Sequence, residues 1–378
     1  MLRIESGTVL SPTGWNLQPI YIDQGLITDQ QNDAPVLNAK GLHILPGIID
    51  IHGDGFERNI MPRPNVSFDL DLALDDTDRQ LAASGITTAY LGITSSWEKG
   101  LRSVSSADQL IRQIARVKNH FKVDFKTHVR HELYNFAGTS VALEWLSEGL
   151  VDALAFNDHT GPAFKNETIN WEKLREQKER GKWLEGELQI LIASLFSQQD
   201  RVYEDSLSLA QSAQDYSVPM LSHDDRSVED RIRYRNIGCQ ICEFPINVNA
   251  AINAKDNNEN IVFGAPNVIR GGSHSGNASA QEMISQNLCT ILASDYYYPS
   301  LLQAPYKLFK SGLGSFEDLW KLVSLNPAKA LGLSDRGELA KGQRADLLIV
   351  DMCETSLNLV ATIAKGKIVY VCDYAKLM

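Results

Sequence analysis

The chain lacks the long apolar segments of a membrane or secreted protein. No run approaches the roughly 20 consecutive apolar residues that span a bilayer, so we expect no transmembrane helix and no membrane partner. Residues 1–6 include an acidic side chain and no long apolar segment follows them, which argues against a signal peptide. Five cysteines in 378 residues are too few, and odd in number, for a disulfide framework. We therefore expect a reducing, cytoplasmic location.

Surplus basic charge is also missing. A net charge of −11 disfavours a general binder of nucleic acid or anionic membranes, because either needs an excess of Lys and Arg. An anionic small substrate remains compatible, since it needs basic residues in one pocket only. Cys239 and Cys242 form a C-x-x-C pair, but no second pair completes a zinc cage, and residues 238–245 are strand-like. We interpret both as core residues.

From about residue 80 the chain alternates strand-like and helical segments. Helical patterns include residues 107–117, 139–147 and 205–214, and a long charged stretch at 171–196. Repeated strand-then-helix units indicate a parallel sheet, and eight of them fit a closed, TIM-like (β/α)8 barrel of the α/β class. An open doubly wound sheet is the alternative, but no Gly-x-Gly-x-x-Gly follows the first strand. The eight expected strands cover residues 44–51, 85–92, 125–133, 151–156, 218–222, 238–244, 260–264 and 289–294.

The two chain ends differ from the middle in their hydrophobic pattern. Both contain short alternating runs punctuated by Gly and Asn, which predict short antiparallel strands. We expect residues 1–43 and 335–378 to pair into one small β-sandwich, with the barrel of residues 44–334 inserted between them.

The first expected strand ends in a pair of metal-ligand residue types. The run from Leu45 to Asp54 is apolar until Asp50 and reads as a buried strand. His52 and Asp54 stand at i and i+2, so a strand directs both side chains to the same face. Imidazole and carboxylate at the end of a barrel strand are a natural start for a divalent-metal site, although a solvated turn would look the same.

Further metal-ligand types follow other strands. A His or carboxylate at one strand end is more often a cap or turn residue, but so many together indicate a metal site. In the third strand, alternation directs His128, Arg130 and Glu132 to one face and His131 to the other. The other strand ends are Asn157-Asp-His159 after the fourth strand, His223-Asp224-Asp225 after the fifth and Ser294-Asp295 after the eighth.

This donor set suits Zn²⁺, with Mn²⁺ or Fe²⁺ as alternatives, because no thiolate stands at these strand ends. One or two metals would be held by His52, Asp54, Glu132, His159, His223 and Asp295. Asp295, Glu132 and His223 are the candidate catalytic residues, with Asp295 as ligand, base or both. His128, Asp224 and Glu57 are second candidates, as ligands or as partners that orient ligands.

Basic residues near these motifs could bind an anion. Arg63 lies on a Pro-flanked loop after the first motif, and Arg130 shares the inward face with Glu132. The glycine-rich segment 264–277 follows the seventh strand and carries Arg270 and His274. Loops after the last two strands of a barrel often bind phosphate, and Arg grips its oxygens bidentately. A flexible loop with a solvated Arg is the simpler reading of that segment.

The layout resembles the amidohydrolase superfamily and, within it, the diphosphatases of bacterial phosphonate breakdown by the carbon–phosphorus lyase pathway. The superfamily-level features are the strand-1 metal motif, the strand-8 Asp, the flanking β domain, and the segments 326–333 and 342–347. The closer matches are His52-x-Asp54 with Glu57 and Pro62-Arg-Pro64, the run 83–88, His128-x-Arg-x-Glu-Leu133, Asp158-His-x-Gly161, Ser222-His-Asp-Asp225, Glu243-Phe-Pro245, the loop 264–277 and Ser294-Asp-Tyr-Tyr297.

The resemblance implies hydrolysis of α-D-ribose 1-methylphosphonate 5-triphosphate at its α-phosphorus, with pyrophosphate leaving. Gly53 and Gly55 depart from the pattern, where Thr and Asn are expected, and Arg58-Asn59 replaces an expected Lys-His, so a paralogue with another substrate is an alternative. The superfamily usually carries two single His ligands after strands 5 and 6, whereas our count places His159 and His223 after strands 4 and 5. A C–N hydrolase, such as an N-acetyl-sugar-phosphate deacetylase or cyclic amidase, and an inactive scaffold stay open, as does a homodimer.

Overall fold

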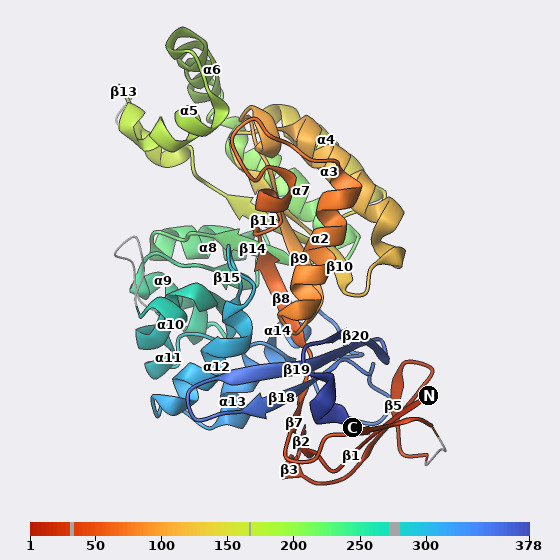
Figure 1. The fold of residues 1–378 in the computed structure, drawn as a ribbon. Coiled ribbons are helices and arrows are strands. Elements are labelled where there is room, and N and C mark those ends of the chain that lie inside the picture. The colour runs from red at the N-terminus through yellow and green to blue at the C-terminus, as the bar shows by residue number, and fades with distance from the viewer. Residues whose placement is uncertain (31–33, 166–167, 272–279) are drawn as a thin grey trace. The chain divides into compact units, whose positions relative to one another are not determined.

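The computed structural model describes residues 1–30, 34–165, 168–271 and 280–378, with the backbone alone at Lys165 and Glu185. The chain divides into two compact units. The first unit comprises Met1–Tyr90, Lys118–Phe125 and Val262–Met378, and the second comprises Leu91–Val117 and Lys126–Ile261. Among the described helices none is long and apolar enough to cross a membrane. Figure 1 shows the path of the chain.

An eight-stranded sheet contains the second to eighth predicted strands and the C-terminal part of the first. The strand order β17-β16-β15-β14-β11-β10-β9-β8 follows the chain order throughout, as in a (β/α)8 barrel. An isolated parallel bridge between Gly53, in β8, and Asp295, just after β17, brings the two edge strands together, so the barrel is nearly closed. The predicted fold class is therefore confirmed. The strands are β8 (Ile48–Gly53), β9 (Ile86–Ser95), β10 (Asp124–Glu132), β11 (Ala153–Asn157), β14 (Met220–His223), β15 (Ile241–Glu243), β16 (Asn260–Gly264) and β17 (Ile291–Ala293).

The first predicted strand, residues 44–51, is in fact two strands in two different sheets. β7 (His43–Pro46) pairs with β18 (Leu347–Met352) outside the barrel, and β8 begins at Ile48. The break falls at Gly47, where an added Cβ would lie only 2.4 Å from the Thr87 hydroxyl oxygen. The residues on both sides of Gly47, from Ile44 to Ile49, are apolar and buried, so the hydrophobic pattern gives no sign of the break.

Strands from both chain ends form two further sheets, as predicted. A six-stranded sheet has the order β20-β19-β18-β7-β2-β3, and a four-stranded sheet has the order β5-β4-β1-β6. The joint between the chain ends is the antiparallel pairing of β18 with β7, in which Ile349 stands opposite Ile44. The exact limits at residues 43 and 335 stay predictions. The remaining strands are β1 (Leu2–Glu5), β2 (Thr8–Ser11), β3 (Gly14–Asn16), β4 (Ile20–Asp23), β5 (Leu26–Thr28), β6 (Val36–Asn38), β19 (Leu357–Ala364) and β20 (Lys367–Val371).

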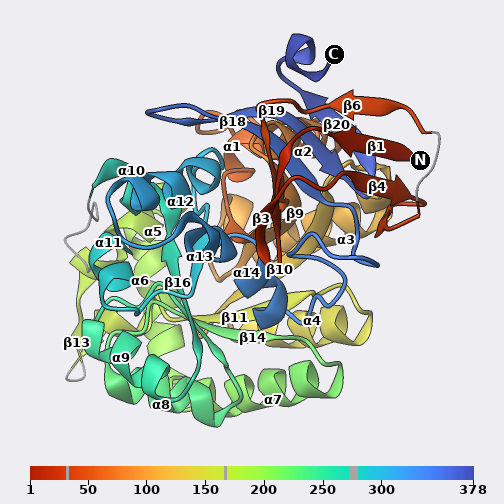
Figure 2. The ribbon, with the colours of Figure 1, turned by 90° about the horizontal axis from the view of Figure 1, so that it is seen from below.

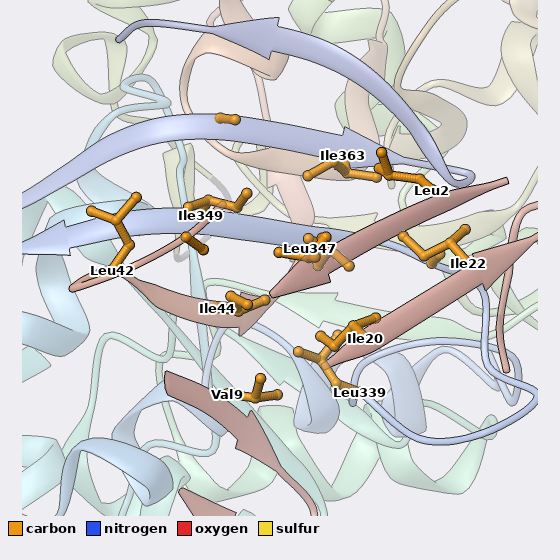
Figure 3. Packing of buried hydrophobic residues seen from close by; sticks show 14 of the residues in the cluster. Leu2, Val9, Ile20, Ile22, Leu42, Ile44, Leu339, Leu347, Ile349 and Ile363 are labelled. Atoms are coloured by element: carbon orange, nitrogen blue, oxygen red, sulfur yellow. The ribbon is translucent and has the colours of Figure 1, made fainter. Parts of the chain in front are cut away.

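A hydrophobic core holds these two sheets together. Figure 3 shows Ile44 and Leu347 at its centre, with Ile22 from the four-stranded sheet and Ile349 and Ile363 from the six-stranded sheet around them. Alternate residues of each strand point inward, which is why β1 and β4 read buried–half-buried in turn. Each buried Ile or Leu contributes roughly 1.5–3 kcal/mol, so the core ties N-terminal and C-terminal segments into one body.

The helices of the first unit follow or cover its strands. α12, which contains Pro305, lies beside α10 and α13 in Figures 1 and 2. Its inward face is apolar, with Leu301 and Leu308 buried. The helices are α1 (Glu57–Ile60), α2 (Leu70–Ala83), α10 (Ala265–Arg270), α11 (Ala280–Ser285), α12 (Ser300–Lys310), α13 (Phe316–Lys321) and α14 (Leu325–Ala330).

In the second unit the long helix predicted at 171–196 is broken. A 3-10 turn at Trp171–Leu174 leads into α5, which ends at Gly181, and α6 begins three residues after Lys182. Lys182 adopts a left-handed conformation with φ of 49°, which ends a helix. Figure 1 shows α5 and α6 apart from the barrel strands of this unit. Its elements are α3 (Val104–Val117), α4 (Phe136–Ser147), β12 (Phe164–Lys165), β13 (Thr168–Ile169), α5 (Arg175–Gly181), α6 (Glu185–Ser197), α7 (Arg201–Asp215), α8 (Val228–Asn236) and α9 (Val248–Asp256).

Candidate metal centre

Three predicted ligands of the first unit come together at the ends of β8 and β17. One donor atom from each of His52, Asp54 and Asp295 lies within 4.8 Å of the others. The backbone fixes this arrangement, because the Asp54 N–H donates to the Asp295 carbonyl at 2.8 Å and the Asp295 N–H donates to the His52 carbonyl at 2.9 Å. His52 is buried, whereas both aspartates are half-buried. This cluster can therefore meet a ligand from solution.

Asp50 forms hydrogen bonds with the residues next to this cluster. Its carboxylate accepts hydrogen bonds from the Ser294 hydroxyl at 2.5 Å, from the Ser294 N–H at 3.0 Å and from the His52 N–H at 3.3 Å. Full burial raises the pKa of Asp50 to about 6, against the lowering effect of these hydrogen bonds. Asp50 thus links the strand that carries His52 to the residue directly before Asp295.

Gly53 and Gly55 make room for Tyr298, a residue that the sequence reasoning did not single out. A Cβ at Gly53 would lie 2.8 Å from Asp50 Oδ2, 2.9 Å from Ser294 Oγ and 3.0 Å from the Tyr298 ring. A Cβ at Gly55 would lie 3.0 Å from the same ring. The ring is buried, and burial raises the pKa of its hydroxyl well above the ordinary value. Both glycines therefore leave space for the Tyr298 ring, and Gly53 also leaves space for Asp50 and Ser294.

Two of the strand ends hold an aspartate in the left-handed conformation. Asp295 follows β17 with φ of 54°, and Asp224 follows β14 with φ of 60°. Asp tolerates this conformation better than most residues, but it still carries backbone strain. Such strain concentrates at functional sites, where it aims a side chain that a regular strand would direct elsewhere.

Basic side chains converge on Tyr296, the residue after Asp295. Arg58 donates to the Tyr296 carbonyl, and Arg270 Nη1 donates to the Tyr296 hydroxyl at 3.3 Å. Arg58 was noted in the sequence only as a departure, and the structure places its positive charge beside the first cluster. Arg63 is exposed, in a turn bridged to Val66. His274 lies outside the described residues.

In the second unit three more ligand-type residues come together. Donor atoms of His159, His223 and Asp224 lie within 4.8 Å of one another. Asp224 Oδ2 is 3.7 Å from His159 Nε2 and 3.8 Å from His223 Nε2, and the two imidazole rings stand edge to face at 5.7 Å. Asp224, a second candidate in the sequence, is thus at the centre of this cluster.

Glu132, at the end of β10, holds the loop that carries His159. Its carboxylate accepts from the His159 N–H at 3.2 Å and from the Thr160 N–H at 3.1 Å, and it lies 3.2 Å from His159 Nδ1. Burial alone would raise the pKa of Glu132, but these contacts outweigh it and hold the pKa below the ordinary value. Burial also opposes the charged form of His159, yet Asp224 and Glu132 raise its pKa to about 9.

His223 is held on both ring nitrogens. Nδ1 lies 2.7 Å from Glu243 Oε2, and Nε2 lies 3.0 Å from Arg130 Nη2. Burial raises the pKa of Glu243 to about 7, although the charges of His128 and Arg130 lower it. Glu243 contacts a predicted ligand but entered the sequence analysis only as part of a motif; its position at the end of β15 was the available signal. Arg130 faces inward as predicted.

A groove of about 700 Å³ lies in the second unit, where β9 and β10 end. Trp97, which lines the groove, donates its indole N–H to the Thr160 hydroxyl at 2.9 Å, and the Thr160 N–H donates to Glu132. Its wall is largely apolar, and its charges are satisfied: Arg112 pairs with three carboxylates, those of Asp108, Glu144 and Glu148. The other lining side chains include Tyr134, Phe136, Val141, Leu191 and Leu195.

Both clusters have the chemistry of a divalent-metal site. Imidazole nitrogen and carboxylate oxygen suit Zn²⁺, Mn²⁺ or Fe²⁺, and neither cluster contains a thiol. Cys239 and Cys242 are instead buried free thiols, as expected, and the Cys242 thiol lies 3.3 Å from Asp225. The donor sets therefore fit a metal and leave its identity open.

Comparison with known proteins agrees with this chemistry. The Amidohydrolase family matches residues 281–370. The alpha-D-ribose 1-methylphosphonate 5-triphosphate diphosphatase of Escherichia coli (strain K12) is 30% identical over 356 residues, which cover 90% of this chain and 92% of that protein.

Solved structures share the fold. A D-hydantoinase from a Bacillus species has a TM-score of 0.65 at 13% identity, covering 99% of this chain and 96% of its own. A prolidase complexed with N-methylphosphonate-L-proline has a TM-score of 0.64 at 12% identity, covering 98% of this chain and all of its own. At these identities the likeness concerns the fold alone. The relative that matches nine-tenths of the sequence and the family match together show that this chain belongs to the amidohydrolase superfamily of hydrolases.

Proposed function

We propose that the chain is a metal-dependent diphosphatase that cleaves the α–β phosphoanhydride of a sugar triphosphate, with α-D-ribose 1-methylphosphonate 5-triphosphate as the first candidate substrate. The observation that carries this proposal is the 30% identity to the Escherichia coli diphosphatase over 90% of the chain. The convergence of Arg58 and Arg270 on Tyr296, next to Asp295, supports an anionic substrate.

We propose that the two clusters supply the ligands of one or two divalent cations. His52, Asp54 and Asp295 would act in the first unit, and Glu132, His159, His223 and Asp224 in the second. A divalent cation, when bound, lowers the pKa of a water toward about 7 and polarises a phosphoryl oxygen. Zn²⁺ is our first choice, because both donor sets combine imidazole and carboxylate.

The chain's own residues would move the proton and carry the charge. Asp295 Oδ accepts the proton of the attacking water. The left-handed backbone at Asp295 orients this carboxylate. Arg270 and Arg58 bind phosphoryl oxygens and stabilise negative charge on the leaving pyrophosphate. Arg130 and Arg63 are further candidates for the same task, as is His274.

The test is phosphorus NMR of protein loaded with Zn²⁺ or Mn²⁺. The candidate triphosphate is run beside ATP and an N-acetyl-sugar phosphate. We expect pyrophosphate from the ribosyl triphosphate, lost in Asp295→Asn and retained in Asp256→Asn, an exposed aspartate at the end of α9. An intact triphosphate after prolonged incubation, with metal bound, contradicts the proposal.

One observation favours a second candidate, a C–N hydrolase. The groove at the ends of β9 and β10, linked to Glu132 through Trp97 and Thr160, is lined largely by aromatic and aliphatic side chains, and Arg112 in it is already paired with carboxylates. Such a groove suits the apolar substituent of an amide better than a chain of phosphates. In the same NMR series, deacylation of the N-acetyl compound without pyrophosphate release would select this second candidate.

A further inference from the structure

Asn157 ends β11 as a fully buried carboxamide in the second unit. Its exposed fraction is 0%, and neither Nδ2 nor Oδ1 has a hydrogen-bond partner among the residues that the structure describes. Burying a carboxamide without partners costs free energy, because water would satisfy both ends. Native proteins keep such groups where a ligand or ordered water completes them.

The register of the sheet places Asn157 between two members of the second cluster. Asn157 stands opposite Glu132 on β10 and opposite His223 on β14. Neighbouring parallel strands lie about 4.8 Å apart, and residues in register direct their side chains to the same face. Asn157 therefore belongs to one row that runs Glu132, Asn157, His223 and then Glu243.

Contacts of adjacent residues confirm which face this is. The Phe156 ring stacks on Tyr234 of α8 at 6.3 Å, so Phe156 points toward the helices. The Ser222 hydroxyl likewise contacts Arg231 of α8 at 2.6 Å. Alternation then directs Asn157 and His223 to the opposite face, inside the barrel.

The two polar atoms of the Asn157 side chain need different partners. Oδ1 needs an electron-poor partner, and Nδ2 needs an acceptor. A divalent cation with an oxygen-containing ligand offers both at once. Amide oxygen is an accepted ligand of hard divalent cations, beside the carboxylate and imidazole donors already in the row.

We propose that Asn157 is a cation-binding residue of the second cluster, with Oδ1 as the ligand atom and Nδ2 as donor to an oxygen of the water or substrate held there. This inference rests on the proposed metal dependence. It adds a ligand from the fourth barrel strand and is independent of which substrate is cleaved.

Two substitutions and one matched control test it. Asn157→Leu removes both polar atoms at similar volume, and Asn157→Asp keeps the oxygen and adds a charge. Gln177→Leu makes the same chemical change at another buried carboxamide, on α5, whose Oε1 also has no partner among the described residues. Affinity for Zn²⁺ or Co²⁺ is measured by competition with a chelator, and the visible spectrum of the Co²⁺ form reports the ligand set.

We expect Asn157→Leu to fold and to bind Zn²⁺ roughly 10–100-fold more weakly, with an altered Co²⁺ spectrum. Asn157→Asp should bind at least as tightly as the parent, and Gln177→Leu should match the parent in both readouts. Parent-like affinity and spectrum in Asn157→Leu would overturn the proposal and assign the amide to a buried water. If Asn157→Leu fails to fold, weak binding by Asn157→Asp overturns it. Failure to release pyrophosphate with these affinities intact would count against the proposed function alone.

Discussion

Gly53→Ala tests whether the close packing at the first cluster is essential. The new Cβ would lie 2.8 Å from Asp50 Oδ2, 2.9 Å from Ser294 Oγ and 3.0 Å from the Tyr298 ring. None of these atoms can retreat cheaply, because Asp50 and Ser294 bond each other at 2.5 Å and Tyr298 is buried. Overpacking costs about 1–3 kcal/mol, and a weakened charged hydrogen bond adds about 1.5–3 kcal/mol.

We therefore expect Gly53→Ala to lower the free energy of unfolding by about 3 kcal/mol. With an unfolding entropy of about 2.1 cal/mol/K per residue, this shifts the melting temperature of 378 residues by about 4 °C. Calorimetry measures the shift, and chelator competition measures the affinity for Zn²⁺. That affinity should fall as well, because the displaced turn carries His52 and Asp54.

The matched control is Gly186→Ala in α6, where no heavy atom lies within 4 Å of an added Cβ. Alanine is more favourable than glycine within a helix by about 0.5–1 kcal/mol, so this variant should be as stable as the parent or slightly more stable. Parent-like stability and metal affinity in Gly53→Ala would refute the reasoning. Such a result would mean that the turn can accommodate a Cβ at position 53 despite the three short distances.

Three other predictions concern separate parts of the chain. Glu132→Gln should weaken Zn²⁺ binding at least about tenfold and lower the pKa of His159, as followed by chelator competition and by NMR titration of the apo-protein. Burial would raise the pKa of Asp124, but Arg336 and Arg344 hold it well below its usual value. The stability that this aspartate contributes is therefore complete above about pH 4 and is lost as the pH falls below it, so acid unfolding of Asp124→Asn should show a shallower pH dependence. Ile44→Ala, in the core of the β-sheets, should cost about 2–5 kcal/mol in urea unfolding without changing metal affinity.

The barrel could be predicted because its repeating signal is local. Most of the eight strands are short, largely apolar runs followed by turn residues and then by a helical pattern with a 3.6-residue period, whereas β10 alternates polar and apolar residues. The break at Gly47 has no such signal, since the apolar pattern continues from one sheet into the other. The left-handed conformation of Lys182 could not be predicted either, because a lysine at this position is also typical of the middle of a charged helix.

The ligand-type residues were predictable for the same reason. His52, Asp295 and His223 stand at strand ends, and the ends of parallel strands in a barrel share one edge. Their supporting partners were not predictable. Tyr298 acts through its contact with two glycines far away in the chain, and Glu243 through a hydrogen bond across 20 residues. Spacing along a sequence contains no information about such distant contacts.

The second cluster depends on register as much as on residue type. A shift of one residue in β14 would turn His223 toward the helices and Ser222 into the barrel. Ser222 resists that shift, because buried Arg231 donates to its hydroxyl at 2.6 Å and to the Cys239 carbonyl at 2.7 Å. Contacts on the outer face of the strand thereby decide which side chains meet on the inner face. The polar network on the outer face of the sheet is thus a condition for the proposed metal site on its inner face.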